Sequence, residues 1–145
     1  MKTQQRLTIW ILVLCAYLLS GCGEVVNEYY ISNHTDTDLA VSLTPFYVET
    51  VDLSSGPLIE DIQKSVRSSL SQPVSFDQEG DSMLFTLPAK TTVFLGISSG
   101  GNDLFSQLEV RSNGQQLAMD RDDYHEYFAV HDNLVGAVVH VLNVR

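Results

Sequence analysis

The sequence predicts an all-β protein, a β-sandwich of immunoglobulin-like or similar type with about eight short strands. Short runs of alternating apolar and polar residues recur between clusters of Gly, Pro, Asn, Asp and Ser, which is the pattern of strands joined by turns. The final run, residues 134–144, is almost continuously apolar, as expected of a strand buried on both faces. We expect this strand inside a sheet, because an exposed edge so apolar would invite aggregation.

The first three strands are expected in quick succession. Residues 29–32 and 39–43 alternate in polarity, and the polar stretch 33–38 between them is rich in residues that bond their own backbone. This arrangement predicts an antiparallel pair of strands joined by a turn. Residues 46–53 form a further run typical of a strand, and residues 54–56 are expected to end it.

Residues 57–71 predict one short inserted helix. Apolar residues recur there every four positions, which would place them on one face of a helix; they are Leu58, Ile62, Val66 and Leu70. Pro57 suits the first helical position. The acidic residues of this segment come early and the basic residues come late, as the helix dipole prefers.

Strand signals resume after the expected helix. Residues 77–81 and 98–103 are expected to form loops, and Asn113-Gly114 is the strongest two-residue hairpin signal in the chain. The remaining strands are expected at 74–76, 83–87, 91–97, 108–110, 117–119, 124–130 and 134–144.

The N-terminal segment has the three zones of a secretory signal. Lys2 and Arg6 give it a positive start, and residues 7–19 are almost wholly apolar. That run is too short to span a bilayer comfortably, since a spanning helix needs about 20 apolar residues. The small residues Ser20 and Gly21 then close it. Residues 1–21 are therefore predicted to be a cleaved signal peptide.

The end of this segment, Leu19-Ser20-Gly21-Cys22, resembles the lipobox of bacterial lipoproteins. In that family a branched apolar residue and two small residues precede an obligatory cysteine. The resemblance implies that Leu19, Ser20 and Gly21 are read by the signal peptidase, that the Cys22 thiol receives a diacylglyceryl group, and that cleavage occurs just before Cys22. A signal cleaved without lipidation and an uncleaved anchor helix are the alternatives.

We therefore expect a signal peptide (1–21), a short lipidated tether (22–27) and one β-sandwich domain (28–145). The domain would sit outside the cytoplasm, held to a cell membrane or outer membrane by lipid. Gly23 follows the cysteine, where an aspartate retains such proteins at the inner membrane of enteric-type bacteria. The resemblance therefore favours the outer membrane, provided that the organism has one.

Composition limits the chemistry of the processed chain. Removal of residues 1–21 leaves 124 residues, enough for one domain. Cys15 leaves with the signal and Cys22 carries lipid, so neither a disulfide nor a thiol nucleophile nor a cysteine-ligated metal is available. Six basic residues remain against eighteen acidic ones, a formal net charge of −12. Nucleic acid is excluded as a partner, because phosphate binding needs a basic face.

The same negative charge favours a cationic protein or a divalent cation as partner, although solubility alone also accounts for it. The densest acidic group contains Asp120, Asp122, Asp123 and Glu126. It fails the EF-hand pattern because the twelfth residue from Asp120 is His131, where glutamate is required. We expect a solvated loop without a metal or other cofactor, and keep a Ca²⁺-dependent module as an alternative.

Histidines and aromatic residues give weaker signals. His34 lies in the 33–38 turn and is expected to face solvent, whereas His140 is expected to be half-buried in the last strand and bonded to a neighbouring carbonyl. Adjacent aromatic pairs, such as Tyr29 and Tyr30, should place one ring of each pair outward, because neighbours on a strand point to opposite faces. Exposed rings of this kind can anchor sugars or proteins.

No catalytic motif is found. Residues 96–100 approach a Gly-x-Ser-x-Gly elbow but miss it by one residue, and no phosphate-binding glycine loop is present. The favoured hypothesis is a non-enzymatic envelope lipoprotein that serves as an interaction or structural module, with a protein or glycan partner. The alternative is an acidic inhibitor or binder of a cationic envelope protein.

Overall fold

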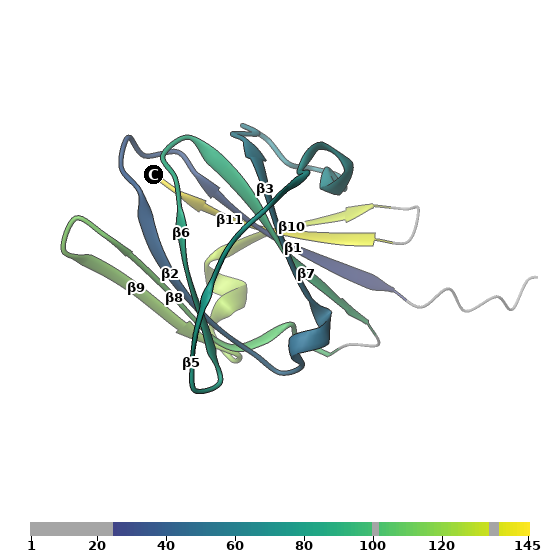
Figure 1. Ribbon diagram of the computed structural model, residues 1–145. Helices are drawn as coiled ribbons and strands as arrows, with labels where there is room; N and C mark the ends of the chain where they lie inside the picture. The colour runs from purple at the N-terminus through teal and green to yellow at the C-terminus, as the bar shows by residue number, and fades with distance from the viewer. Residues whose placement is uncertain (1–24, 100–101, 134–136) are drawn as a thin grey trace, which may run out of the picture.

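Two facing β-sheets form the domain (Figure 1). A computed structural model describes residues 25–99, 102–133 and 137–145. The predicted signal peptide, 1–21, and Cys22 lie outside these ranges. The described residues form eleven strands and three short 3₁₀ turns, and the predicted all-β sandwich is confirmed.

The six-stranded sheet has the order β10-β11-β1-β7-β3-β4. β1 and β11 are parallel, and the other neighbours are antiparallel. As predicted, the last strand lies inside a sheet. The strands are β1 (Val26–Asn33), β3 (Val51–Pro57), β4 (Gln72–Pro73), β7 (Thr91–Ser99), β10 (Phe128–Asn133) and β11 (Ala137–Val144).

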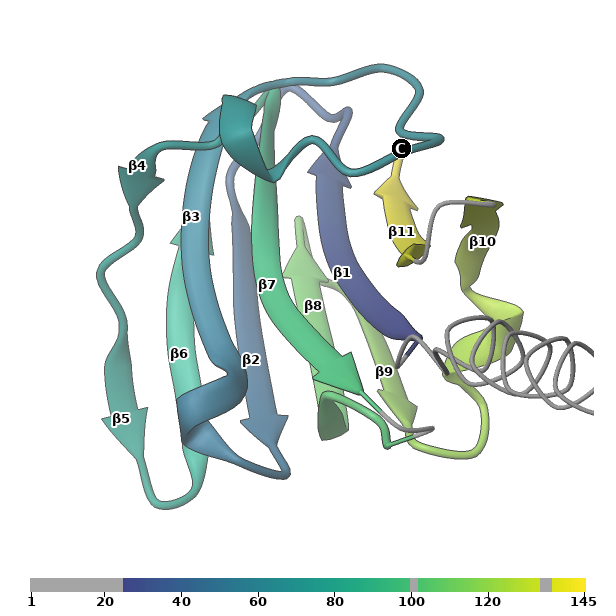
Figure 2. The ribbon, with the colours of Figure 1, turned by 90° about the vertical axis from the view of Figure 1, so that its right-hand side faces the viewer.

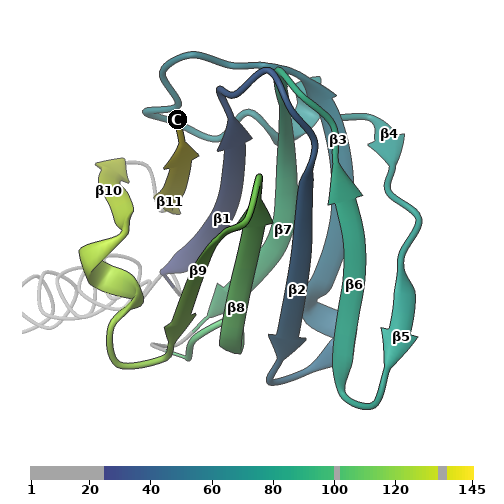
Figure 3. The same ribbon diagram turned by 90° about the vertical axis from the view of Figure 1, so that its left-hand side faces the viewer.

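The five-stranded sheet has the order β5-β6-β2-β8-β9, and all its neighbours are antiparallel. Its strands are β2 (Leu39–Pro45), β5 (Asp77–Glu79), β6 (Ser82–Leu87), β8 (Phe105–Ser112) and β9 (Gln115–Asp120). In the two side views, Figure 2 and Figure 3, this sheet faces β1, β7 and β3 across the core.

Alternation in the five-stranded sheet builds the core between the layers. In β2, Leu39, Val41 and Leu43 are buried, and Ala40 on the opposite face is exposed. β6 and β8 follow the same rule, as their polarity patterns predict. The outer face of this sheet is therefore polar and open to solvent.

The six-stranded sheet is covered on both faces. Tyr29 points into the core between the sheets, whereas Tyr30 points the other way into a second cluster with Phe94. Both tyrosines are at most 1% exposed. The expectation that one ring of this pair faces outward is wrong, because a segment of irregular chain packs on the outer side of the sheet.

That segment is the strap, residues 58–71, and the helix predicted for 57–71 is absent. Pro57 ends β3, and the only regular turn of the strap is η2 (Arg67–Ser69). Ile62 and Leu70 are buried against the sheet, where they join the cluster around Tyr30 and Phe94. Packing of this irregular segment on β1, β7 and β11 buries these apolar residues at the helical spacing without a helix.

The predicted pairing of residues 29–32 with 39–43 is also wrong. β1 and β2 belong to different sheets, so the 33–38 turn carries the chain from one layer to the other. Asn33, which is fully buried, holds this crossing: its side-chain amide donates to the carbonyl oxygens of Thr37 at 2.9 Å and Pro88 at 2.9 Å. The bond to Pro88 joins the 33–38 turn to the connection between β6 and β7. A contact between segments so far apart cannot be predicted from the local sequence.

One predicted tight turn is confirmed, whereas several predicted element boundaries are wrong. The Asn113-Gly114 hairpin is confirmed: Ser112 pairs with Gln115, and both turn residues have positive φ. Residues 77–79, expected in a turn, form β5, so only Gly80-Asp81 turns. Other predictions also differ from the structure: η1 (Val48–Thr50) interrupts 46–53, β3 includes 54–56, no strand forms at 74–76, β7 extends to Ser99, η3 (Tyr124–Glu126) precedes β10, and β1 begins at Val26 instead of 28.

Candidate functional site

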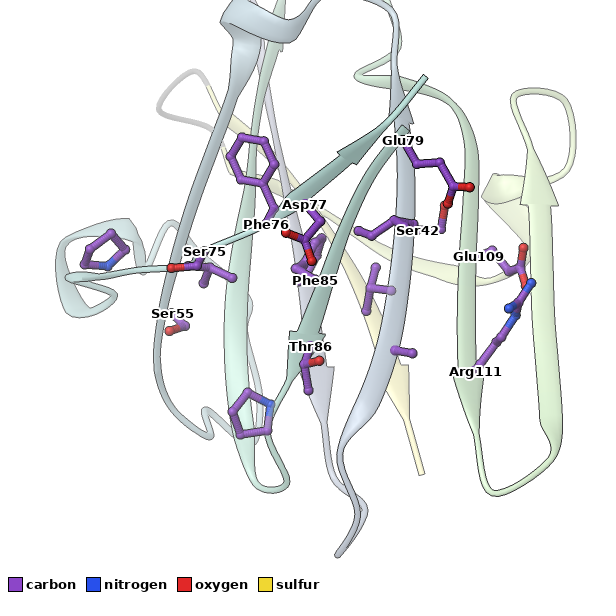
Figure 4. A pocket seen from close by; sticks show the side chains of 16 residues that line it. Ser42, Ser55, Ser75, Phe76, Asp77, Glu79, Phe85, Thr86, Glu109 and Arg111 are labelled. Carbon is purple, nitrogen blue, oxygen red and sulfur yellow. The ribbon is translucent and has the colours of Figure 1, made fainter. Parts of the chain in front are cut away.

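A groove of about 730 Å³ lies on the outer side of the five-stranded sheet and across its β5 edge (Figure 4). The chain between β4 and β5 closes one side, and β8 closes the other. Its lining residues are Ala40, Val41, Ser42, Ser55, Pro73, Val74, Ser75, Phe76, Asp77, Glu79, Leu84, Phe85, Thr86, Pro88, Glu109 and Arg111.

The floor of the groove is made of outward-facing side chains of β2 and β6. Because the sheet alternates, β2 turns Ala40 and Ser42 outward, and β6 turns Leu84 and Thr86 outward. Ser42 pairs with Leu84 across the β2–β6 ladder, so these residues form one continuous surface. A floor this shallow admits an extended chain or a flat ligand.

Carboxylates and one aromatic ring surround the floor. Asp77 and Glu79 project from β5, and neither carboxylate makes a hydrogen bond or ion pair with any described residue. Arg111 is the only cation in the lining, and its guanidinium pairs with Glu109 on the same strand. Phe76 stands beside Asp77 with 45% of its surface exposed (Figure 4).

A second hollow of about 440 Å³ continues the surface toward β9. It shares Ser42 and Glu109 with the first and adds Asp120 and Asp123. We call the two together the acidic groove. It runs across the sheet from β5 to β9, and its five carboxylates face one arginine. The arrangement can hold a cationic ligand by charge.

The acidic cluster singled out in the sequence lies at one end of this groove. The Asp123 carboxylate accepts the backbone N–H of Asp120 at 2.8 Å, and the Asp120 carboxylate accepts that of Asp122 at 2.9 Å. Glu126 lies in η3 and is exposed. Among residues 25–99, 102–133 and 137–145, no three His, Cys, Asp or Glu side chains are close enough to hold a metal ion. Two of the candidate ligands instead stabilise a turn.

A buried polar layer lies between the sheets near the start of β1. His140 is 4% exposed, and its ring stacks on Tyr29 with 4.6 Å between ring centroids. His140 Nε2 lies 3.1 Å from the side-chain oxygen of Asn27, and the Tyr124 hydroxyl donates to Asp103 at 3.1 Å. His140 is thus buried more deeply than expected, and the carbonyl it bonds belongs to a side chain.

Burial sets the protonation of this layer. It lowers the pKa of His140 to about 4, assisted by repulsion from His125 and opposed by Asp103. Burial also raises the pKa of Tyr29 and of Tyr124. His140 Nδ1 has no hydrogen-bond partner in the described chain. The His140 ring is therefore neutral at neutral pH and serves the packing of the core.

His34 was expected to face solvent, but its side chain is only 11% exposed. Its Nε2 lies 3.0 Å from the Asn143 side chain and its Nδ1 lies 3.4 Å from the Glu60 carboxylate. The 33–38 turn thus packs against the last strand and the strap. Such contacts join segments far apart in the sequence, which explains why the turn alone suggested exposure.

The groove itself was not predicted from the sequence. Residues 77–81 were expected to form a turn and 74–76 a strand, so Phe76, Asp77 and Glu79 were not grouped. One sequence feature could have indicated the groove: the acidic residues of 77–79 are followed by Gly80, which is typical of a β-hairpin turn. Glu109 and Arg111 join the site only through sheet pairing, since β2 lies between β6 and β8.

Comparison of the chain with protein-family models, curated proteins and solved structures finds no match. No helix in the described part of the chain is long and apolar enough to cross a membrane.

Proposed function

We propose that the chain is a lipid-anchored protein of the bacterial cell envelope that binds a cationic segment of a partner protein in the acidic groove and catalyses no reaction. The observation that carries the binding proposal is the pair of unpartnered carboxylates, Asp77 and Glu79, beside the exposed ring of Phe76. The lipobox-like ending at Cys22 supports the anchor.

Charge favours a cationic ligand at this site. Arg111 already pairs with Glu109, so it leaves the carboxylates of β5 uncompensated. Lysine and arginine side chains on a partner would supply charge-assisted hydrogen bonds to these oxygens. The net charge of −12 on the processed chain would also speed the approach of a basic partner.

The shape of the groove favours an extended segment. The four strand spacings from β5 to β9 give a track of about 19 Å, which fits several residues of extended chain. The aliphatic stems of lysine or arginine can lie along Ala40 and Leu84. A guanidinium can also stack on the exposed ring of Phe76.

Binding of an arginine-rich decapeptide to the processed, acylated protein in detergent tests the groove. We expect measurable binding by titration calorimetry at low salt and weaker binding at high salt, because exposed charges are screened. The double substitution Asp77→Asn and Glu79→Gln should weaken binding by about tenfold or more, equivalent to at least about 1.4 kcal/mol.

The matched control is Glu126→Gln with Asp132→Asn, which removes the same charge outside the groove. It should leave binding nearly unchanged. Equal weakening by both double variants would mean that the peptide responds only to net charge, and it would refute the groove as the binding site.

A further inference from the structure

One end of the sandwich is the end at which β1 begins, and we call it the entry end. It consists of the start of β1 and the loops 46–50, 102–104 and 121–127. Val26 at the start of β1 pairs with Ser99 at the end of β7, and Val51 pairs with Gly96 on the other side of β7. Figure 2 shows η1 and the end of β7 at this end of the sandwich.

Apolar side chains gather at the entry end. Of the eight exposed large apolar residues in the described chain, six lie there: Val25, Phe46, Tyr47, Val48, Ile97 and Tyr127. Tyr47 is 58% exposed and Val48 is 54% exposed. The opposite end is polar instead, with the 33–38 turn, Lys90 and Asn113. The entry end therefore suits apolar surroundings, and the opposite end suits water.

The loop that carries Tyr47 and Val48 is held in place. The Thr50 side chain donates to the Tyr47 carbonyl oxygen at 2.7 Å, which closes the η1 turn. The backbone N–H of Phe46 donates to Leu104 at 3.1 Å, and the Arg121 guanidinium lies 5.6 Å from the centre of the Phe46 ring. Burial of Tyr47 and Val48 by a partner would therefore cost little conformational entropy.

The tether places this loop near the membrane. Val26 is four positions after Cys22, so a lipid on Cys22 would keep the start of β1 within about 14 Å of the interface. β1 and β3 flank β7 on opposite sides, so the start of β3 lies about 10 Å to the side of β1. Consecutive aromatic and branched residues are typical of protein surfaces in the interfacial layer.

We propose that Phe46, Tyr47 and Val48 insert into the interfacial layer of the lipid bilayer that holds Cys22. This inference rests on the proposed lipid anchor and orients the domain, with the 33–38 turn directed away from the membrane. Glu49, Asp122 and Glu126 lie at the same end. Zwitterionic lipid therefore suits the contact better than anionic lipid, which these carboxylates would repel.

A tryptophan reporter tests the insertion. Trp10, the only tryptophan, lies in the predicted signal peptide, so Tyr47→Trp gives the processed chain a single fluorophore. The acylated variant is purified from bacterial membranes and reconstituted into phosphatidylcholine vesicles with brominated acyl chains. We expect blue-shifted emission and quenching by the bromine atoms. Val48→Trp is a second reporter in the same loop and should behave alike.

Phe76→Trp is the matched control, because Phe76 is also an exposed aromatic residue. The β5–β6–β2 register places Asp77 level with Ser42, so Phe76 lies about 13 Å or more along the strands from the 46–50 loop. Its emission should remain unquenched although the variant floats with the vesicles.

Flotation separates the two proposals. If the Tyr47→Trp and Val48→Trp variants float with the vesicles but emit as in water, the anchor stands and membrane insertion of the loop is refuted; the apolar loop would then be left for a protein partner. If the acylated protein fails to float, the anchor is refuted and the inference with it.

Discussion

The imidazole ring of His140 lies flat on the phenol ring of Tyr29, with 4.6 Å between centroids and 11° between planes. Tyr29 and His140 are direct partners in the parallel β1–β11 pair, so the first and last strands meet through this stack. The histidine is enclosed by the core, and its environment makes the folding of the domain sensitive to acid.

Stability should fall as pH drops from about 6.5 to about 4. The unfolded chain takes up a proton at His140 near its ordinary pKa of 6.5, whereas the folded chain takes it up only near 4. Between these values the unfolded state binds more protons, so acid favours unfolding. After allowance for solvent screening, we expect His140 to contribute a loss of about 1–2 kcal/mol.

Chemical denaturation at a series of pH values measures this loss. His140→Gln keeps a polar group opposite Asn27 and cannot take up a proton in this range. The free energy of unfolding of the native protein minus that of the variant therefore separates the contribution of His140 from that of the carboxylates. If this difference in the free energy of unfolding does not change between pH 6.5 and 4, the lowered pKa of His140 in the folded chain is contradicted.

Gly96 should tolerate no side chain. Its φ is +148°, and a Cβ atom there would lie 2.3 Å from the Thr50 carbonyl oxygen and 3.1 Å from Val51 Cα. Both neighbours are backbone atoms, so relief requires the β3 and β7 strands to move apart. We expect Gly96→Ala to lower the free energy of unfolding by about 3 kcal/mol or more.

Gly80→Ala is the comparison for this substitution. Gly80 also has a positive φ, +61°, but no atom lies within 4 Å of the position that a Cβ would take. Only the conformational cost applies there, about 1 kcal/mol. If the two variants lose the same free energy of unfolding in urea, the backbone atoms of Thr50 and Val51 near Gly96 add nothing to the cost of a side chain there.

A buried hydrogen-bond group should hold the strap on the sheet. The Tyr30 hydroxyl donates to one Glu28 carboxylate oxygen at 2.6 Å, and Ser65 donates to the other at 3.0 Å. Tyr30 also accepts the backbone N–H of Val66 at 3.3 Å. Burial, together with Glu28, raises the pKa of Tyr30 to about 12, so this hydroxyl stays protonated at neutral pH.

Removal of that hydroxyl by Tyr30→Phe should cost about 2 kcal/mol, because it leaves a buried carboxylate and a backbone N–H with fewer partners. Hydrogen exchange should accelerate in residues 58–71 before the rest of the domain. Tyr47→Phe, which removes an exposed hydroxyl, should change stability by less than about 0.5 kcal/mol. Uniform acceleration over the whole domain would contradict a local role of Tyr30.

Calcium should leave thermal unfolding unchanged. The carboxylates of Asp120 and Asp123 already accept backbone N–H groups in their turn. Asp123→Ala should therefore destabilise the domain by about 1 kcal/mol, equally with calcium and with a chelator. A melting temperature that rises with calcium in the native protein and not in this variant would restore the metal hypothesis for Asp120, Asp122, Asp123 and Glu126.

The strands that the sequence predicted well are those with one open face. β2, β6 and β8 alternate cleanly because only one side of their sheet is covered, and the Asn113-Gly114 hairpin is set by two adjacent residues. Where both faces of a sheet are covered, as at Tyr29 and Tyr30, the two-residue alternation of side chains no longer predicts which of them is exposed.

Two features depended on contacts that no local pattern reports. The four-residue spacing from Leu58 to Leu70 suits a helix, but the same side chains can lie along the outer face of a sheet, and packing on Tyr30 and Phe94 decided the outcome. The acidic groove joins Asp77 to Glu109 across β6 and β2, and that order of strands follows from the whole fold.

The proposed membrane-anchored function depends on lipidation of Cys22. Intact-mass analysis of the protein extracted from bacterial membranes measures it directly. We predict a chain that begins at Cys22 and carries a thioether-linked diacylglycerol, and we predict that Cys22→Ser leaves the precursor unprocessed. An unmodified cysteine in the membrane fraction, or normal processing and fractionation of the serine variant, would contradict the anchor.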